Sequence, residues 1–116
     1  MSNILYTYGT LRPGISEPVK VPGKLYAVAW FPGAKLDPNS DSTFLAERVP
    51  VIDWKGVDAY EGYNPDNPEG SLYIRKPFLD GFIYEYNRPV DELEEVTSGD
   101  WLQHAKEERG INAGRF

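Results

Sequence analysis

The chain is 116 residues long with a formal net charge of −6, and its 12 basic residues are scattered rather than clustered. This length supports one hydrophobic core, so we expect a single domain over residues 1–116, and the negative charge opposes binding to nucleic acid. The sequence has no cysteine and one histidine, His104, which excludes disulfides, thiolate nucleophiles and cysteine-based or multi-histidine metal sites.

The N-terminal residues lead into a short apolar segment without a basic region or a long hydrophobic stretch. No apolar run elsewhere approaches the length that crosses a membrane. We therefore expect a cytoplasmic protein that binds neither membranes nor nucleic acid and that is a monomer or weak homodimer.

The first predicted strand, residues 4–8, ends in a loop with the sequence Tyr8-Gly9-Thr10-Leu11-Arg12-Pro13-Gly14. Glycine permits close approach of a ligand, and the Pro-Gly pair favours a turn. Successive backbone N–H groups in a turned segment can surround an anion, so this loop is a candidate anion-binding site. A strand followed by an ordinary Pro-Gly turn is the alternative interpretation.

Short segments rich in β-branched and aromatic residues, bounded by proline and glycine, dominate the rest of the chain. Further strands are predicted over residues 20–30, 44–48, 72–79 and 81–87, in an antiparallel or mixed sheet. Asp80-Gly81 is the expected hairpin turn between the last two strands. We expect this strand pair to form the centre of the sheet.

A helix is predicted over residues 53–61, with Asp53 as its N-cap and Gly62 at its end, which places Glu61 on the last turn. If the neighbouring tyrosines share one cavity with those of the first strand, desolvation would raise the pKa of Glu61 toward the range useful for proton transfer. The alternative is a solvated glutamate at a helix end. Asp58, on the same helical face, could raise that pKa or compete as a base, but we expect it to be solvated.

A second helix is predicted from residue 100 to 109, capped by Ser98 or Asp100 and ended by Gly110. Trp101 at its start is interpreted as a packing anchor and Asp100 as a cap. Neither residue is assigned a chemical role.

Several short motifs follow one another in a fixed order: Tyr-Gly-Thr-Leu-Arg-Pro-Gly at 8–14, Pro-Gly-Lys-Leu-Tyr at 22–26, Phe-Pro-Gly-Ala at 31–34, Glu-Gly-Tyr at 61–63, Tyr-Ile-Arg at 73–75, Phe-Ile-Tyr-Glu-Tyr at 82–86 and Ser-Gly-Asp-Trp at 98–101. In this order they resemble the gamma-glutamylcyclotransferase-like family over nearly the whole chain. That family often has a Gly-Glu pair in the strand before the catalytic helix, whereas residues 42–48 lack the glycine. The branch of the family, and therefore the leaving group, stays open.

The resemblance implies an α+β fold, a small, mixed, partly closed β-barrel with a few short helices around a cavity whose floor is the Tyr-Gly-Thr-Leu loop. It also implies conversion of a small-molecule γ-glutamyl amino acid or γ-glutamylamine to 5-oxoproline and a free amine, without metal, nucleotide or other cofactor. The amine of the substrate is its own nucleophile, so no serine, cysteine or histidine machinery is needed.

By the same resemblance, Glu61 is the general acid/base. The expected substrate-binding residues are Tyr8, Gly9, Thr10, Leu11 and Tyr73. Backbone N–H groups of the loop would bind the substrate carboxylate or stabilise the oxyanion, and this division is left open. Each tyrosine could instead pack in the core with its hydroxyl bonded locally.

Arg12 and Arg75 could clamp a carboxylate, but surface or structural ion pairs are the favoured interpretation of both. Two other functions stay open. One is a binding or regulatory module that keeps the cavity for a small ligand without turnover, and the other is an exposed aromatic platform for a sugar or a protein.

Overall fold

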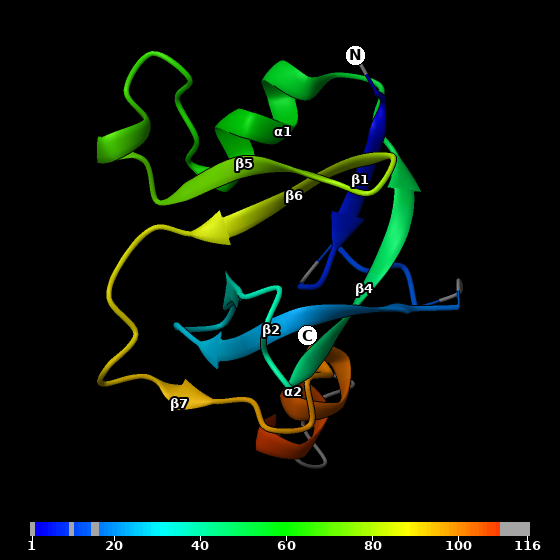
Figure 1. The fold of residues 1–116 in the computed structure, drawn as a ribbon, viewed down its shortest axis with the longest axis vertical. Coiled ribbons are helices and arrows are strands. Elements are labelled where there is room, and N and C mark those ends of the chain that lie inside the picture. The colour runs from blue at the N-terminus through cyan, green and yellow to red at the C-terminus, as the bar shows by residue number, and fades with distance from the viewer. Residues whose placement is uncertain (1, 10, 15–16, 110–116) are drawn as a thin grey trace.

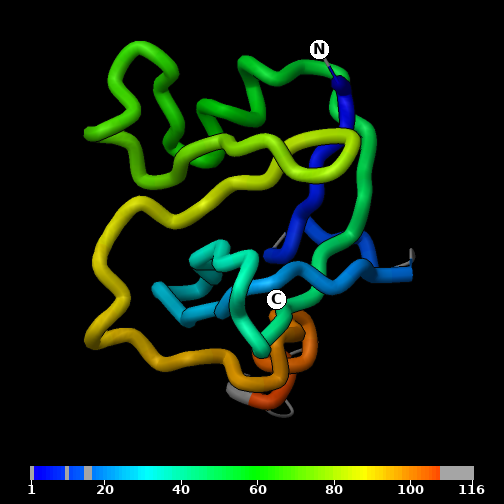
Figure 2. Tube along the Cα trace, in the orientation of Figure 1, coloured from blue at the N-terminus to red at the C-terminus, as the bar shows by residue number. Residues whose placement is uncertain are grey.

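The computed structural model describes residues 2–9, 11–14 and 17–109 (Figures 1 and 2). Within these residues the elements are the strands β1 (Ile4–Thr7), β2 (Val19–Ala27), β3 (Pro32–Leu36), β4 (Thr43–Pro50), β5 (Tyr73–Phe78), β6 (Gly81–Tyr86) and β7 (Glu94–Glu95), the helices α1 (Trp54–Glu61) and α2 (Trp101–Arg109), and a 3-10 turn, Pro68–Gly70.

The strands form one mixed sheet in the order β3-β2-β4-β1-β6-β5, with β7 added to β2. β1 runs antiparallel to β4 and parallel to β6, which confirms a mixed sheet. The prediction that the β5–β6 pair forms the centre was wrong, because β4 and β1 lie there and β5 is an edge strand. Pro77 in β5 has no N–H to donate, and proline is confined to such edge positions.

The turn between β5 and β6 also differs from the prediction by one residue. Phe78 pairs with Gly81, so Leu79 and Asp80 form the turn and Gly81 begins β6. A Cβ atom at Gly81 would lie 2.4 Å from the carbonyl oxygen of Ile4. The glycine is therefore required by the close approach of β6 to β1, not by the turn.

The sheet curls until β3 faces β6 and the barrel is partly closed. Side-chain contacts bridge the two strands: Lys35 Nζ donates to the carbonyl of Tyr86 at 2.8 Å, and the Leu36 N–H donates to Glu85 Oε2 at 2.8 Å. The predicted strand 20–30 stops at Ala27, because the N–H groups of the next two residues turn back to the carbonyl of Phe31. β3 and β7 were not predicted.

Two helices flank the sheet at opposite ends of the molecule (Figure 1). α1 lies beside β5 and β6, and α2 lies below β2 and β4. The N–H of Gln103 donates to Asp100 Oδ1 at 3.3 Å, so Asp100 caps α2 as predicted, whereas Gly110 lies outside the described residues. The architecture is α+β, as predicted, and none of its described helices is long and apolar enough to span a membrane.

Alternation along β1 divides the buried side chains between two clusters. Leu5 packs below α1 with Tyr73, whereas Tyr6 and Tyr8 point to the other face and pack with Phe44. The long segment from β6 to β7 connects the part of the molecule that contains α1 with the part that contains α2 (Figure 2). The candidate site lies where the two clusters meet.

Candidate active site

A cavity of about 270 Å³ opens where the end of β1 meets the end of α1. Its walls come from β1 and the loop after it, the turn between β2 and β3, the last residues of α1, and the start of β5. Of the predicted site residues, the structure brings five to this cavity: Tyr8, Gly9, Leu11, Glu61 and Tyr73. Thr10 lies outside the described residues.

Helix α1 is capped at both ends by the predicted residues, and it places Glu61 at the cavity. Asp53 has extended backbone and its side chain accepts from the Lys55 N–H at 3.1 Å, which begins α1. Gly62 has a φ of 69° and its N–H returns to the carbonyl of Ala59, which ends the helix in the left-handed conformation that glycine adopts readily. The local sequence therefore positions Glu61 as the last helical residue, at the cavity wall.

The Glu61 carboxylate is partly buried, and no described residue gives it a hydrogen bond or an ion pair. Burial raises its pKa from 4.5 to about 7. Asp58 does not contribute to this shift, in contrast to the repulsion considered from the sequence. At neutral pH both the protonated and the charged form of Glu61 are populated, which suits a group that accepts and returns a proton.

Three tyrosines surround Glu61. Burial raises the pKa of Tyr8, Tyr73 and Tyr84, and the nearby Glu61 charge adds to the shift in each case. The Tyr8 hydroxyl donates to the carbonyl of Tyr84 at 2.6 Å, and the Tyr73 hydroxyl donates to the carbonyl of Pro32. Both rings wall the cavity, and both hydroxyl groups donate to the protein. The Tyr8 hydroxyl also accepts from the N–H of Ala34 at 3.3 Å, so its hydrogen bonds serve the fold.

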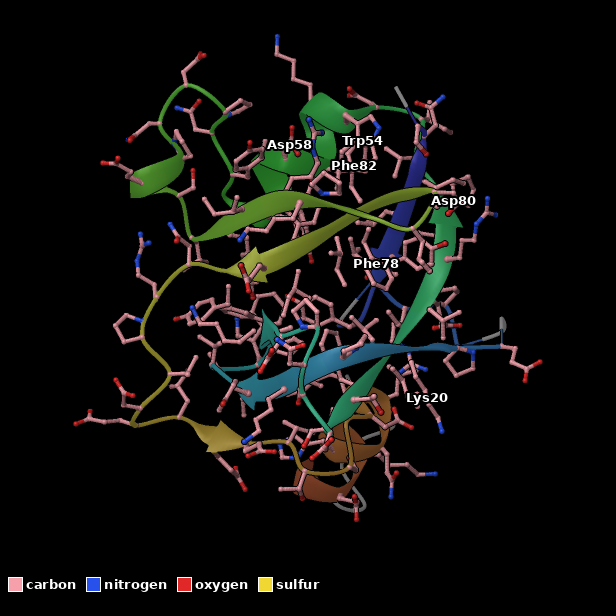
Figure 3. The ribbon with its side chains drawn as sticks, viewed as in Figure 1. Lys20, Trp54, Asp58, Phe78, Asp80 and Phe82 are labelled. Carbon is pink, nitrogen blue, oxygen red and sulfur yellow. The ribbon has the colours of Figure 1, made fainter. Side chains whose placement is uncertain are left out.

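Asp58 is buried, which contradicts the expectation of a solvated side chain. It accepts from Arg75 Nη1 at 3.1 Å and from the hydroxyl of Tyr84. The Arg75 guanidinium in turn lies 4.6 Å from the ring centre of Trp54 and 5.2 Å from that of Phe82. Figure 3 shows Asp58, Trp54 and Phe82 gathered between α1 and β6. Arg75 is thus a structural ion-pair residue, one of the two interpretations left open by the sequence.

Arg12 also belongs to a structural ion pair. Its Nε donates to Glu47 Oε2 at 2.9 Å and its Nη1 to Asp100 Oδ1 at 3.0 Å. Glu47 is fully buried in β4 and also accepts from the N–H of Gly14 at 3.0 Å. The loop after β1 is therefore tied to β4 and α2 by one buried cluster, behind the residues that face the cavity.

Sequence reasoning missed the role of Glu47. The residue follows the buried alternation of Phe44 and Ala46 but occupies the opposite strand face, where an exposed side chain is the usual expectation. Arg12 and the N–H of Gly14 reach this face from the loop after β1 and bond the buried carboxylate there. Trp101 at the start of α2 is buried in the core as predicted.

No protein-family model matches the chain, and no curated protein matches it. Solved structures do. The ytfP protein of Escherichia coli is 25% identical and superposes with a TM-score of 0.61 over 87% of this chain and 97% of its own. YkqA of Bacillus subtilis is 18% identical with a TM-score of 0.66, covering 97% of this chain but 44% of YkqA, so the chain spans less than half of that protein.

The uncharacterized protein PH0828 of Pyrococcus horikoshii is 16% identical, with a TM-score of 0.60 over 95% of this chain and 98% of its own. These likenesses extend over almost the whole chain, as do the sequence motifs. The chain therefore has the gamma-glutamylcyclotransferase-like fold, and its neighbours support its placement in that superfamily.

Proposed function

We propose that the protein is a gamma-glutamyl cyclotransferase-type enzyme that converts a γ-glutamyl amino acid or γ-glutamylamine to 5-oxoproline and a free amine, with Glu61 as its general acid/base. One observation carries the proposal. A carboxylate whose pKa is raised to about 7 lies unpaired among the described residues, in a cavity that also includes the loop after β1.

The reaction needs two proton movements, and one carboxylate can perform both. The charged Glu61 accepts a proton from the α-ammonium of the substrate, and the freed amine attacks the γ-carbonyl. The new N–C bond closes the five-membered ring, the γ-amide C–N bond breaks, and the proton passes from Glu61 to the departing nitrogen. The ring nitrogen also gives up its second proton, which leaves on the released amine as an ammonium ion. All atoms of the substrate appear in 5-oxoproline and the amine, so neither water nor a cofactor is consumed.

The loop after β1 supplies the second requirement, which is a set of preorganised donors. Gly9 and Leu11 line the cavity, where main-chain N–H groups of the loop would bind the substrate carboxylate or the oxyanion. The hydrogen bond from the Arg12 N–H to the Gly9 carbonyl, at 3.1 Å, and the cluster around Glu47 hold this loop in place. A substrate held with its amine against its own γ-carbonyl has already lost the freedom that slows cyclisation.

The test is 5-oxoproline release by the wild type, Glu61→Gln and Glu69→Gln from a panel of γ-glutamyl amino acids and γ-glutamylamines. Glu69 is exposed in the 3-10 turn and does not line the cavity, so it is the matched control. We expect Glu61→Gln to lower turnover about 10²–10⁴-fold while Glu69→Gln retains it. A folded wild type that binds but does not convert any compound would instead favour a binding module.

The role proposed for Glu61 also predicts how kcat/KM depends on pH. Because Glu61 must be charged to accept the first proton, kcat/KM should rise with pH through an apparent pKa of about 7, the value of the free enzyme. A rise of kcat/KM with an apparent pKa near 4.5, the ordinary value for a glutamate, would contradict the conclusion that burial raises the pKa of Glu61.

A further inference from the structure

The mouth of the cavity is apolar, and it exposes large side chains to solvent. Leu11, Trp30 and Tyr60 are 41%, 60% and 58% exposed, and all three line the same cavity. They come from three different segments: the loop after β1, the β2–β3 turn and the last turn of α1. Exposed apolar groups that converge on one opening mark a binding surface more often than isolated ones do.

A continuous row of aromatic rings leads inward from this mouth. Trp30 contacts Phe31 edge to face at 5.2 Å between ring centres, and Phe31 lies 6.4 Å from Tyr73. The exposure falls along the row from the open Trp30 to the buried Tyr73. A ligand that reaches from the floor to the mouth therefore lies against aromatic faces and edges over its whole length.

No lysine, arginine or histidine lines the cavity among the described residues, and Glu61 is its one carboxylate. Arg12 and Arg75, the arginines closest in sequence to site residues, give their guanidinium groups to Glu47, Asp100 and Asp58. The molecule as a whole carries a net charge of −6. A second carboxylate at the mouth would lose water without gaining a cation and would lie near the Glu61 charge.

We propose, on the basis of the function proposed above, that the mouth binds the leaving group and selects an uncharged, apolar amine. The preferred substrates are then γ-glutamyl amides of aliphatic or aromatic amines, and the γ-glutamyl derivatives of amino acids and peptides are the poorer ones. The γ-glutamyl end occupies the loop and Glu61, while Trp30, Leu11 and Tyr60 cover the apolar part of the leaving group.

Matched pairs of substrates separate charge from size. γ-Glutamylphenethylamine and γ-glutamylphenylalanine differ by the tail carboxylate alone, as do γ-glutamylethylamine and γ-glutamylalanine. We expect kcat/KM to be about tenfold or more higher for the amine member of each pair, and higher for phenethylamine than for ethylamine. γ-Glutamyl-1,4-diaminobutane tests the alternative that the acidic molecule prefers a cationic tail.

A positive charge placed at the mouth should weaken the preference for the uncharged amine. Trp30→Arg supplies the missing cation and removes one ring, so it should narrow the phenethylamine-to-phenylalanine ratio about tenfold. Ile52→Arg is the matched control, because Ile52 is fully exposed and does not line the cavity, and this variant should keep the wild-type ratio.

The outcomes distinguish the two proposals. Faster turnover of the amino acid derivative or of the cationic amine would overturn the proposal that the mouth selects an uncharged, apolar amine. An equal change of the phenethylamine-to-phenylalanine ratio in both arginine variants would also overturn it. Either result would leave the cyclotransferase proposal standing. Absence of 5-oxoproline from all five compounds would overturn both.

Discussion

Two carboxylates lie on opposite sides of the loop after β1, and their surroundings differ. Behind the loop, Glu47 is fully buried and bonded to Arg12, which also pairs with Asp100. In front of the loop, Glu61 is partly buried with no cation beside it among the described residues, and its pKa rises to about 7. A buried charge with its partner serves to hold a structure together, whereas a carboxylate left without one becomes a group that can exchange a proton at neutral pH.

The same contrast recurs within α1. Asp58 and Glu61 are three residues apart, yet Asp58 accepts from Arg75 and Tyr84 whereas Glu61 faces the cavity. One helix thus carries a structural and a candidate catalytic carboxylate. Their neighbours, and not their sequence spacing, assign the two roles.

The largest stability effect is expected behind the loop. Arg12→Met removes the cation that is bonded to the fully buried Glu47, so we expect a loss of about 3–5 kcal/mol in the free energy of unfolding, measured by urea denaturation. Arg48→Met is the control, because the Arg48–Asp80 pair is exposed on the surface and its loss should change stability far less. Similar losses in both variants would remove the distinction between the buried cluster and an ordinary surface pair.

In front of the loop, removal of a charge should stabilise the protein. The folded pKa of Glu61 lies above 4.5, so its protonated form favours folding below that pH, and this contribution is lost as the pH rises through about 7. At pH 8 we therefore expect Glu61→Gln to be more stable than the wild type by up to about 3 kcal/mol, and near pH 4 to be equal to it. Urea denaturation at pH 4 and pH 8 measures this stability difference, with Glu69→Gln as control. A stability difference between Glu61→Gln and the wild type that does not change with pH would contradict an uncompensated charge on Glu61.

Asp58→Asn tests whether the two carboxylates of α1, Asp58 and Glu61, have separate roles. The variant weakens the bonds to Arg75 and Tyr84 and leaves the guanidinium among aromatic rings, so we expect a loss of about 1–3 kcal/mol in unfolding free energy. The pKa of Glu61, followed by carbon NMR of its carboxyl, should stay near 7, because burial alone raises it. A large fall of that pKa in Asp58→Asn would show that the two carboxylates are coupled.

The smallest effect concerns the cavity tyrosines. Tyr73→Phe removes the hydroxyl that donates to the Pro32 carbonyl and should cost about 1 kcal/mol in thermal or urea unfolding. Tyr63→Phe is its matched control, since the Tyr63 hydroxyl has no hydrogen-bond partner among the described residues and its ring packs against Tyr84. Equal stability of Tyr73→Phe and wild type would instead favour a hydroxyl reserved for a ligand.

Local features of the sequence determined α1 and the placement of Glu61. An N-cap such as Asp53 and a C-terminal glycine such as Gly62 act through hydrogen bonds to residues two to four positions away, so they can be recognised without the fold. The strands on either side of the first loop and the Asp100 cap are local in the same sense. Together with the order of the motifs, they were sufficient to predict the α+β class, the partly closed barrel and five residues that meet at one cavity.

The tertiary structure decided what depends on distant partners. Strand order places β5 at the edge, and Gly81 is needed by the approach of Ile4, which lies 77 positions earlier in the sequence. The pairing of Asp58 with Arg75, the burial of Glu47 and the convergence of Leu11, Trp30 and Tyr60 at one mouth all join segments far apart in the chain. The sequence shows which side chains can carry a charge, but whether a charge is paired, and so what its pKa and role become, depends on which segments the fold brings beside it.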